Sequence, residues 1–119
     1  TGWLDLVALK YTAMINGLTE LAITKLDVLS GLETVQAAVA YGYDGKVSSR
    51  FPSELQTLAR VTPVFTDYSG WKENIEHITD YNDLPEAARN YLQFVESFVG
   101  VPIRLVSTGP AREQTIIRY

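Results

Sequence analysis

Apolar residues recur at helical spacing in two parts of the chain, one near its start and one near its end. Residues 3–17 carry two such stripes, which predict a helix covered on most sides that stops at Gly17. Residues 84–99 carry one continuous stripe and predict a second helix, with Asp83 as its N-cap and Gly100 as its stop. The second stripe comprises Leu84, Ala88, Tyr91, Leu92, Val95, Phe98 and Val99.

Shorter apolar runs predict strands. These runs are residues 20–25, 34–43, 47–51, 60–67, 103–106 and 114–118. Asp44-Gly45 is a turn signal that predicts a hairpin between the second and third runs, and Pro63 makes the fourth an edge or irregular strand. Residues 66–82 are rich in turn formers and predict a surface loop. The fold class expected is α/β, a single piece with a small mixed sheet, a β-hairpin and two main helices.

Composition narrows the class of protein. The chain has 119 residues, of which 46% are hydrophobic and 20% charged, so it is long and apolar enough for one globular domain. It has no cysteine, which excludes disulfides and thiolate metal sites. The net charge is −4 and the basic residues are scattered, so we expect no nucleic acid or membrane surface as a partner. Since no apolar run approaches the roughly 18 residues of a membrane span, and no signal peptide is evident, we expect a cytoplasmic protein.

The first motif with a chemical meaning is Thr24-Lys25-Leu26-Asp27, directly after a predicted strand. It is close to the Asn-Lys-x-Asp signature of GTP-binding proteins, with Thr in place of Asn. Guanine presents two adjacent donors, N1–H and the N2 amino group, and one carboxylate accepts both. Adenine lacks this pair and would leave the carboxylate unpaired, while the aliphatic stem of Lys25 can cover the face of a base. Taken alone, the motif favours a simpler interpretation, an exposed Lys and an Asp that caps the next turn.

The second motif, Ser107-Thr108-Gly109-Pro110, also follows a predicted strand directly. Glycine allows a backbone to approach a ligand closely, and backbone N–H groups at such a turn could meet guanine O6. Ligands of α/β folds gather at the carboxyl ends of strands, where both motifs are expected. An ordinary Gly-Pro turn is the alternative for this motif alone.

Together the two motifs predict a pocket for a base without a cradle for phosphates. The nearest approach to a phosphate-binding loop is residues 40–47, but Ala40 and Val47 stand where that pattern needs Gly and Ser or Thr. We therefore expect this segment to be a hairpin turn. We expect neither catalytic residues nor metal ligands in the chain, with the single histidine, His77, on the surface and Trp71 as a packing anchor.

Several short blocks resemble the C-terminal region of the adenylosuccinate synthetase family in order and spacing. The resemblance covers essentially the whole chain. The blocks are Gly2-Trp3-Leu4-Asp5, Thr24-Lys25-Leu26-Asp27-Val28-Leu29, Val39-Ala40-Tyr41, Ser69-Gly70-Trp71, Leu84-Pro85, Gly100-Val101-Pro102-Ile103 and Ser107-Thr108-Gly109-Pro110-Ala111-Arg112.

The resemblance implies a larger, P-loop-like GTP-dependent ligase, of which residues 1–119 are the C-terminal guanine-recognition domain. Such a ligase joins IMP and L-aspartate to give adenylosuccinate, GDP and phosphate in AMP biosynthesis. The resemblance further implies Mg²⁺ as cofactor, a homodimer, and a guanine site formed by Lys25, Leu26, Asp27, Ser107, Thr108, Gly109 and Pro110. The family's phosphate loop and catalytic Asp and His have no counterpart in this sequence, so we expect an inactive fragment. The alternative is a stand-alone nucleotide-binding or protein-interaction module in which both motifs are only turns.

Overall fold

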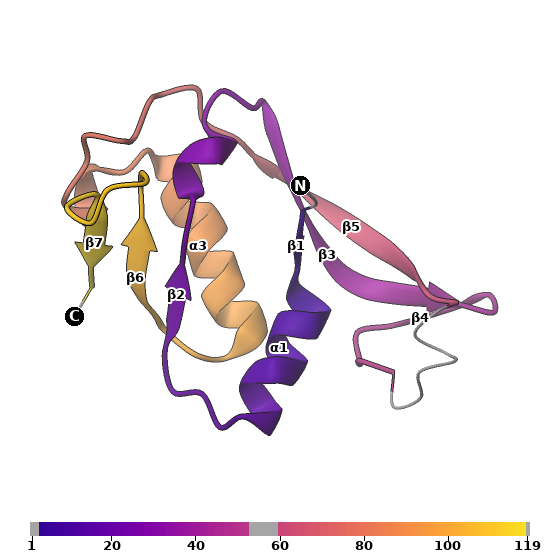
Figure 1. Ribbon diagram of the computed structural model, residues 1–119. Coiled ribbons are helices and arrows are strands. Elements are labelled where there is room, and N and C mark those ends of the chain that lie inside the picture. Colours follow the sequence, from indigo (N-terminus) through magenta and orange to yellow (C-terminus); the bar gives the residue numbers. More distant parts are fainter. Residues whose placement is uncertain (1–2, 53–59, 119) are drawn as a thin grey trace.

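The computed structural model describes residues 3–52 and 60–118, and these form two small sheets with two α-helices (Figure 1). In chain order the elements are β1 (Leu4–Asp5), α1 (Leu6–Ile15), β2 (Leu21–Ile23), the 3-10 helix η1 (Leu26–Leu29), β3 (Thr34–Tyr43), β4 (Lys46–Ser48), β5 (Thr62–Ser69), the 3-10 helix η2 (Tyr81–Asp83), α3 (Glu86–Val99), β6 (Ile103–Ser107) and β7 (Thr115–Ile117). The α/β class and the two main helices are confirmed.

The strands divide between two mixed sheets, where the sequence predicted one. In the first sheet β3 is central, with β1 parallel and β4 antiparallel along one side and β5 antiparallel along the other. In the second sheet β6 is central, with β2 parallel and β7 antiparallel to it. Figure 1 shows α3 lying against the second sheet, while β3 and β5 extend away from it as a long ribbon.

The first helix is shorter than predicted because Asp5 caps it. Its side chain accepts a hydrogen bond of 3.0 Å from the N–H of Ala8, so the helix begins at Leu6 and Trp3 lies outside it. The Tyr41 hydroxyl donates to the other carboxylate oxygen of Asp5, which ties the helix start to β3. Burial, followed by this bond and the carboxylate charge, raises the pKa of Tyr41.

The hairpin predicted at Asp44-Gly45 is confirmed. Both residues have positive φ, +53° and +77°, as a tight two-residue turn between antiparallel strands requires. The edge position predicted for Pro63 is also confirmed, because β5 pairs only with β3 among the described strands. The loop predicted from residue 66 begins later than expected. Pairing of β5 with β3 continues to Ser69, and those backbone hydrogen bonds outweigh the local turn preference.

The apolar stripe of α3 forms the centre of the core. Ala88, Leu92 and Val95 are completely buried, and the helix ends as predicted at Gly100, which has a φ of +84°. Asp83 is not its N-cap. That position belongs to Pro85, whose fixed φ suits a helix start, while Asp83 lies in η2.

Tyr91 on α3 should make the fold sensitive to alkali. Burial, with a smaller contribution from neighbouring Tyr68, raises the pKa of Tyr91 from 10.0 to about 12. Between these values the unfolded chain ionises Tyr91 and the folded chain does not, so unfolding releases a proton and stability falls as pH rises. We expect the free energy of unfolding to drop by up to about 3 kcal/mol from this residue. Denaturant titrations at pH 9 to 12 should show a smaller drop in Tyr91→Phe than in the parent chain; an equal drop would contradict the assignment.

Candidate functional site: two loops at one end of a parallel strand pair

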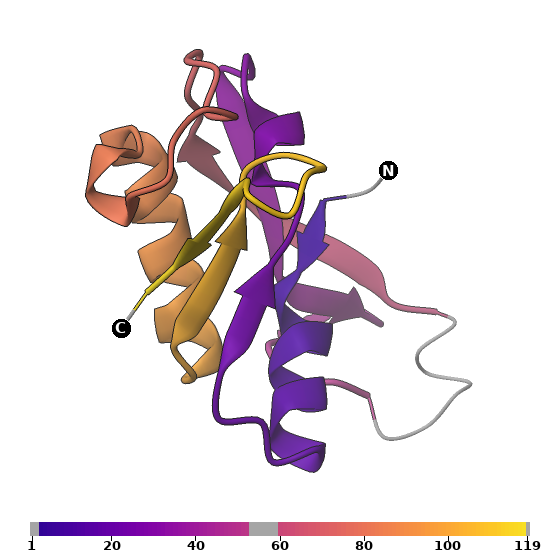
Figure 2. The same cartoon turned by 60° about the vertical axis from the view of Figure 1, so that its left-hand side comes forward.

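The pairing of β2 with β6 brings the two sequence motifs to the same end of the second sheet. The strands run parallel, with Leu21 opposite Ile103 and Ile23 opposite Val106. Residues 24–27 leave the carboxyl end of β2, and residues 107–110 begin at the carboxyl end of β6. Figures 1 and 2 both show η1 and the loop after β6 at this end, and η1 contacts β6. The carboxyl ends of parallel strands are where α/β folds gather ligands.

The first loop holds its residues at different depths. Leu26 is 1% exposed and anchors η1 in the core, so its side chain is a packing group. Lys25 is exposed, and Asp27 is half-buried within η1. Lys25 also has a left-handed backbone, with a φ of +59°. This conformation costs a non-glycine residue about 1–2 kcal/mol, and such strain is concentrated at functional sites.

The second loop is closed by its own hydrogen bonds. The Ser107 hydroxyl donates to the Gly109 carbonyl at 2.9 Å, and the Thr108 N–H donates to the Gln114 carbonyl at 2.8 Å. Thr108 is completely buried, and its hydroxyl lies 3.4 Å from the Ile78 carbonyl and 3.2 Å from that of Gln114. The Thr108 side chain is therefore part of the loop's support.

Gln114 is a residue of this site that the sequence did not single out. Its side-chain oxygen accepts from the Ala111 N–H at 2.9 Å, and its amide nitrogen donates to the Glu76 carbonyl at 3.2 Å. A Cβ on Gly109 would lie 2.4 Å from this side chain, so the glycine leaves the space that Gln114 fills. Gly109 is buried and Pro110 is exposed. No local pattern marks Gln114, because its bond to Glu76 joins segments that are distant in the sequence.

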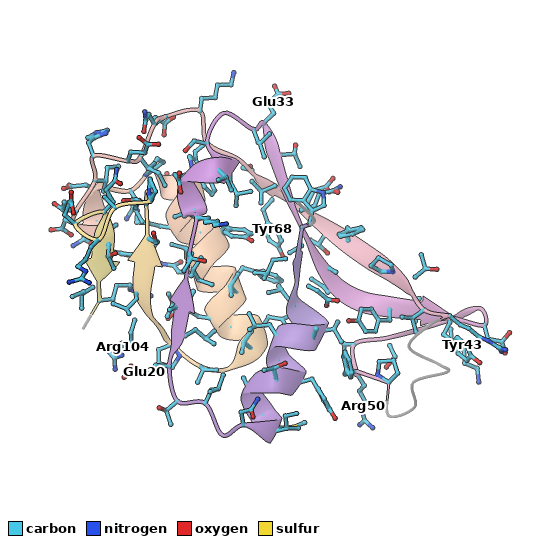
Figure 3. The ribbon with its side chains drawn as sticks, in the orientation of Figure 1. Glu20, Glu33, Tyr43, Arg50, Tyr68 and Arg104 are labelled. Atoms are coloured by element: carbon cyan, nitrogen blue, oxygen red, sulfur yellow. The ribbon has the colours of Figure 1, made fainter. Side chains whose placement is uncertain are left out.

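Residues 40–47 form part of the β3–β4 hairpin, as predicted, and not a phosphate-binding loop. A shallow hollow of about 330 Å³ near the turn is lined by Tyr43, Asp44 and Arg60. Figure 3 places Tyr43 at the far tip of the ribbon, well away from β2 and β6, so this hollow is separate from the two loops. The same view shows Glu20 beside Arg104 at the opposite end of those strands from the loops, where they form an ion pair of 3.4 Å.

Other residues weighed from the sequence lie where they were expected. His77 is exposed, and Trp71 is 2% exposed within the core. Within residues 3–52 and 60–118, no group of three or more His, Cys, Asp or Glu side chains is arranged to hold a metal ion. None of the helices in the described part is long and apolar enough to cross a membrane.

Comparison with known proteins decides the family. The model of the family described as adenylosuccinate synthetase matches residues 1–116. The chain belongs to the adenylosuccinate synthetase family. Adenylosuccinate synthetases of Salinibacter ruber and Kluyveromyces lactis are each 52% identical over 115 residues, which is 97% of this chain. These residues span 26% and 27% of the two relatives, so the chain corresponds to about a quarter of an adenylosuccinate synthetase.

A solved structure of the same family shares the fold. The fully ligated adenylosuccinate synthetase from Plasmodium falciparum superimposes with a TM-score of 0.91 at 34% sequence identity. The match covers 99% of this chain and 29% of that one. The two small sheets and their helices are therefore the arrangement that this family uses for one part of a larger enzyme.

Proposed function

We propose that this chain is the guanine-recognition part of a GTP-dependent ligase, which joins IMP and L-aspartate to give adenylosuccinate, GDP and phosphate. The observation that supports this most directly is the parallel pairing of β2 with β6, because it brings residues 24–27 and 107–110 together. Membership of the adenylosuccinate synthetase family supports the reaction. The second sheet thus supplies specificity for a nucleotide whose reaction takes place elsewhere in the larger protein.

In the proposed site, the two loops form hydrogen bonds with two different parts of the base. The half-buried Asp27 carboxylate accepts hydrogen bonds from guanine N1–H and N2–H. The stem of Lys25 covers one face of the ring, and Leu26 holds η1 in position beneath it. The backbone N–H groups of Ser107 and Gly109 are assigned as donors to guanine O6. Adenine offers an acceptor where guanine has N1–H, so it would leave the carboxylate unpaired at a cost of about 3 kcal/mol or more.

Phosphate binding, catalysis and the sites for IMP and L-aspartate are assigned to the rest of the protein. Within the described residues, no group of three or more His, Cys, Asp or Glu side chains is arranged to hold a metal ion. The magnesium that assists phosphoryl transfer is likewise assigned to the rest of the protein. We expect no ligase activity from the 119 residues alone. The whole protein is proposed to be cytoplasmic and homodimeric, as the family resemblance implies.

The test measures nucleotide choice in a full-length enzyme. These 119 residues would replace the matching segment of the Salinibacter ruber relative, and KM would be measured for GTP and for ATP. We expect Asp27→Ala to raise the KM for GTP about a hundredfold, because two hydrogen bonds to a charged group are lost. The KM for ATP should change little, so most of the preference for GTP should disappear.

Asp83→Ala is the matched control. Asp83 is an exposed carboxylate in η2 whose loss should leave both KM values unchanged. If Asp27→Ala also left both KM values unchanged, residues 24–27 would form only a turn and would not bind the base. A protein-interaction module would then remain as the alternative for this segment.

A further inference from the structure

Residues 70–78, hereafter the 70–78 segment, form most of the connection from β5 to η2, across the end of the molecule where the two loops lie (Figures 1 and 2). The segment is fixed to the core by three apolar side chains. Trp71 is 2% exposed, Ile75 is fully buried and Ile78 is 9% exposed. Its polar side chains from residue 72 to 74 and at 76 and 77 are exposed.

One end of the segment is bonded to the chain that follows η1. The Gly70 N–H donates to the Glu33 carbonyl at 2.9 Å, and the Gly31 N–H donates to the Trp71 carbonyl at 2.8 Å. The Trp71 indole N–H donates to the Ser30 hydroxyl at 3.1 Å. Because Ser30 is the C-cap of η1 and its N–H donates to the Asp27 carbonyl, these bonds fix the 3-10 turn that carries Asp27.

The other end of the segment is bonded to the second loop. The Ile78 carbonyl is within reach of the buried Thr108 hydroxyl, and the Glu76 carbonyl accepts from the Gln114 side chain. Gln114 in turn holds the Ala111 N–H. One short stretch of chain is therefore hydrogen-bonded to both halves of the base site.

We propose that the 70–78 segment sets the spacing and orientation between Asp27 and the 107–110 loop, with Trp71 and Gln114 as its positioning residues. The inference rests on the proposed guanine site. Specific binding of the base requires that the hydrogen bonds to Asp27 and to the 107–110 loop have good geometry at the same time. Hydrogen bonds weaken steeply when one partner shifts or tilts. Rigid support of this kind is what holds a recognition site within about 0.5 Å of its productive geometry.

Two conservative variants test the proposal in the full-length chimera with the Salinibacter ruber relative. Trp71→Phe keeps an aromatic anchor but loses the indole N–H. Gln114→Met keeps the length of the side chain but loses both hydrogen bonds of its amide group. We expect each to raise the KM for GTP about threefold to tenfold with kcat unchanged. Inosine lacks the N2 amino group, so the ratio of KM for ITP to KM for GTP reports how well Asp27 is aligned, and this ratio should fall.

Two control variants separate positioning from loss of stability. Gln93→Met removes an exposed glutamine from α3 and should have no effect. Val95→Ala makes a cavity in the core of α3, lowering the melting temperature while leaving the ITP to GTP ratio as in the parent. If Trp71→Phe and Gln114→Met behaved like Val95→Ala, with reduced melting temperatures and an unchanged ratio, the segment would be packing alone and the proposal would fail.

Hydrogen exchange provides a measure that needs no nucleotide. Trp71→Phe should speed exchange of the Gly31 N–H and also that of Thr108, because both loops depend on one segment. Faster exchange at Gly31 alone would overturn the link between the loops, even if Asp27→Ala abolished the preference for GTP. Conversely, Trp71→Phe could speed exchange at both Gly31 and Thr108 while Asp27→Ala had no effect on nucleotide choice. The proposed guanine site would then be wrong, but the 70–78 segment would still be shown to couple the two loops.

Discussion

Replacing Asp27 by Asn is expected to shift the nucleotide preference of the proposed base site from GTP to XTP. Xanthine carries a carbonyl at C2 where guanine carries an amino group, so the Asn amide can donate to O2 while its oxygen accepts from N1–H. With guanine, the same amide would set one donor against another. We expect the KM for GTP to rise about a hundredfold and that for XTP to fall by a similar factor.

The measurement is steady-state KM for GTP, XTP and ITP in the chimera, with Asp83→Asn as the matched exposed control. The control should leave the order of the nucleotides unchanged. An Asp27→Asn enzyme that lost affinity equally for all three nucleotides would show that the carboxylate supports the loop and does not read the base. A reversal of preference, in contrast, requires direct contact between residue 27 and the ring.

Gly70→Ala is expected to cause the largest loss of stability of any Gly→Ala substitution among the described residues. A Cβ at residue 70 would lie 2.0 Å from the Leu32 carbonyl oxygen and 2.8 Å from its carbonyl carbon. These are backbone atoms, so the 70–78 segment or the 30–33 turn must move and the bond from the Gly70 N–H to Glu33 must weaken. We expect a loss of about 3 kcal/mol, which lowers the melting temperature by about 10 °C.

Gly42→Ala serves as the matched control because it also adds a methyl group to a glycine, in this case one within β3 of the first sheet. Its Cβ would lie 3.7 Å or more from its neighbours, which is ordinary van der Waals contact. Thermal unfolding followed by circular dichroism should show little change for this variant. Equal melting temperatures for the two variants would mean that the 30–33 turn adapts readily, and that the close approach at Gly70 does not constrain the site.

Local signals in the sequence predicted the elements that depend on local physics. Asp44-Gly45 specified the hairpin because these residues adopt positive φ at small cost, and the stripe of α3 predicted its buried face. Leu4 and Asp5 were misassigned to a helix. Their pairing with Ala37 and Ala38 of β3 is a long-range interaction that a helical pattern in the sequence does not reveal.

The division into two sheets was missed for the same reason. No sequence pattern near residues 20–25 indicates that β2 pairs with β6 and not with β3. The placement of the two motifs at the ends of strands was nevertheless predicted correctly, since each motif directly follows its own strand in the sequence. Trp71 was predicted as a packing anchor, but its hydrogen bond to Ser30 and the role of Gln114 escaped prediction, because single hydrogen bonds between distant segments leave no periodic pattern.

The parallel pairing of β2 with β6 also determines the order in which this chain can fold. Leu21 and Ile103 are separated by about 80 residues, so this contact requires closure of a long loop and forms slowly. On a ribosome, β2 cannot pair with β6 until residues 103–107 have emerged. The proposed base site therefore cannot be complete in a chain whose synthesis stops before residues 103–107, so early termination before this point should yield molecules that do not retain a nucleotide.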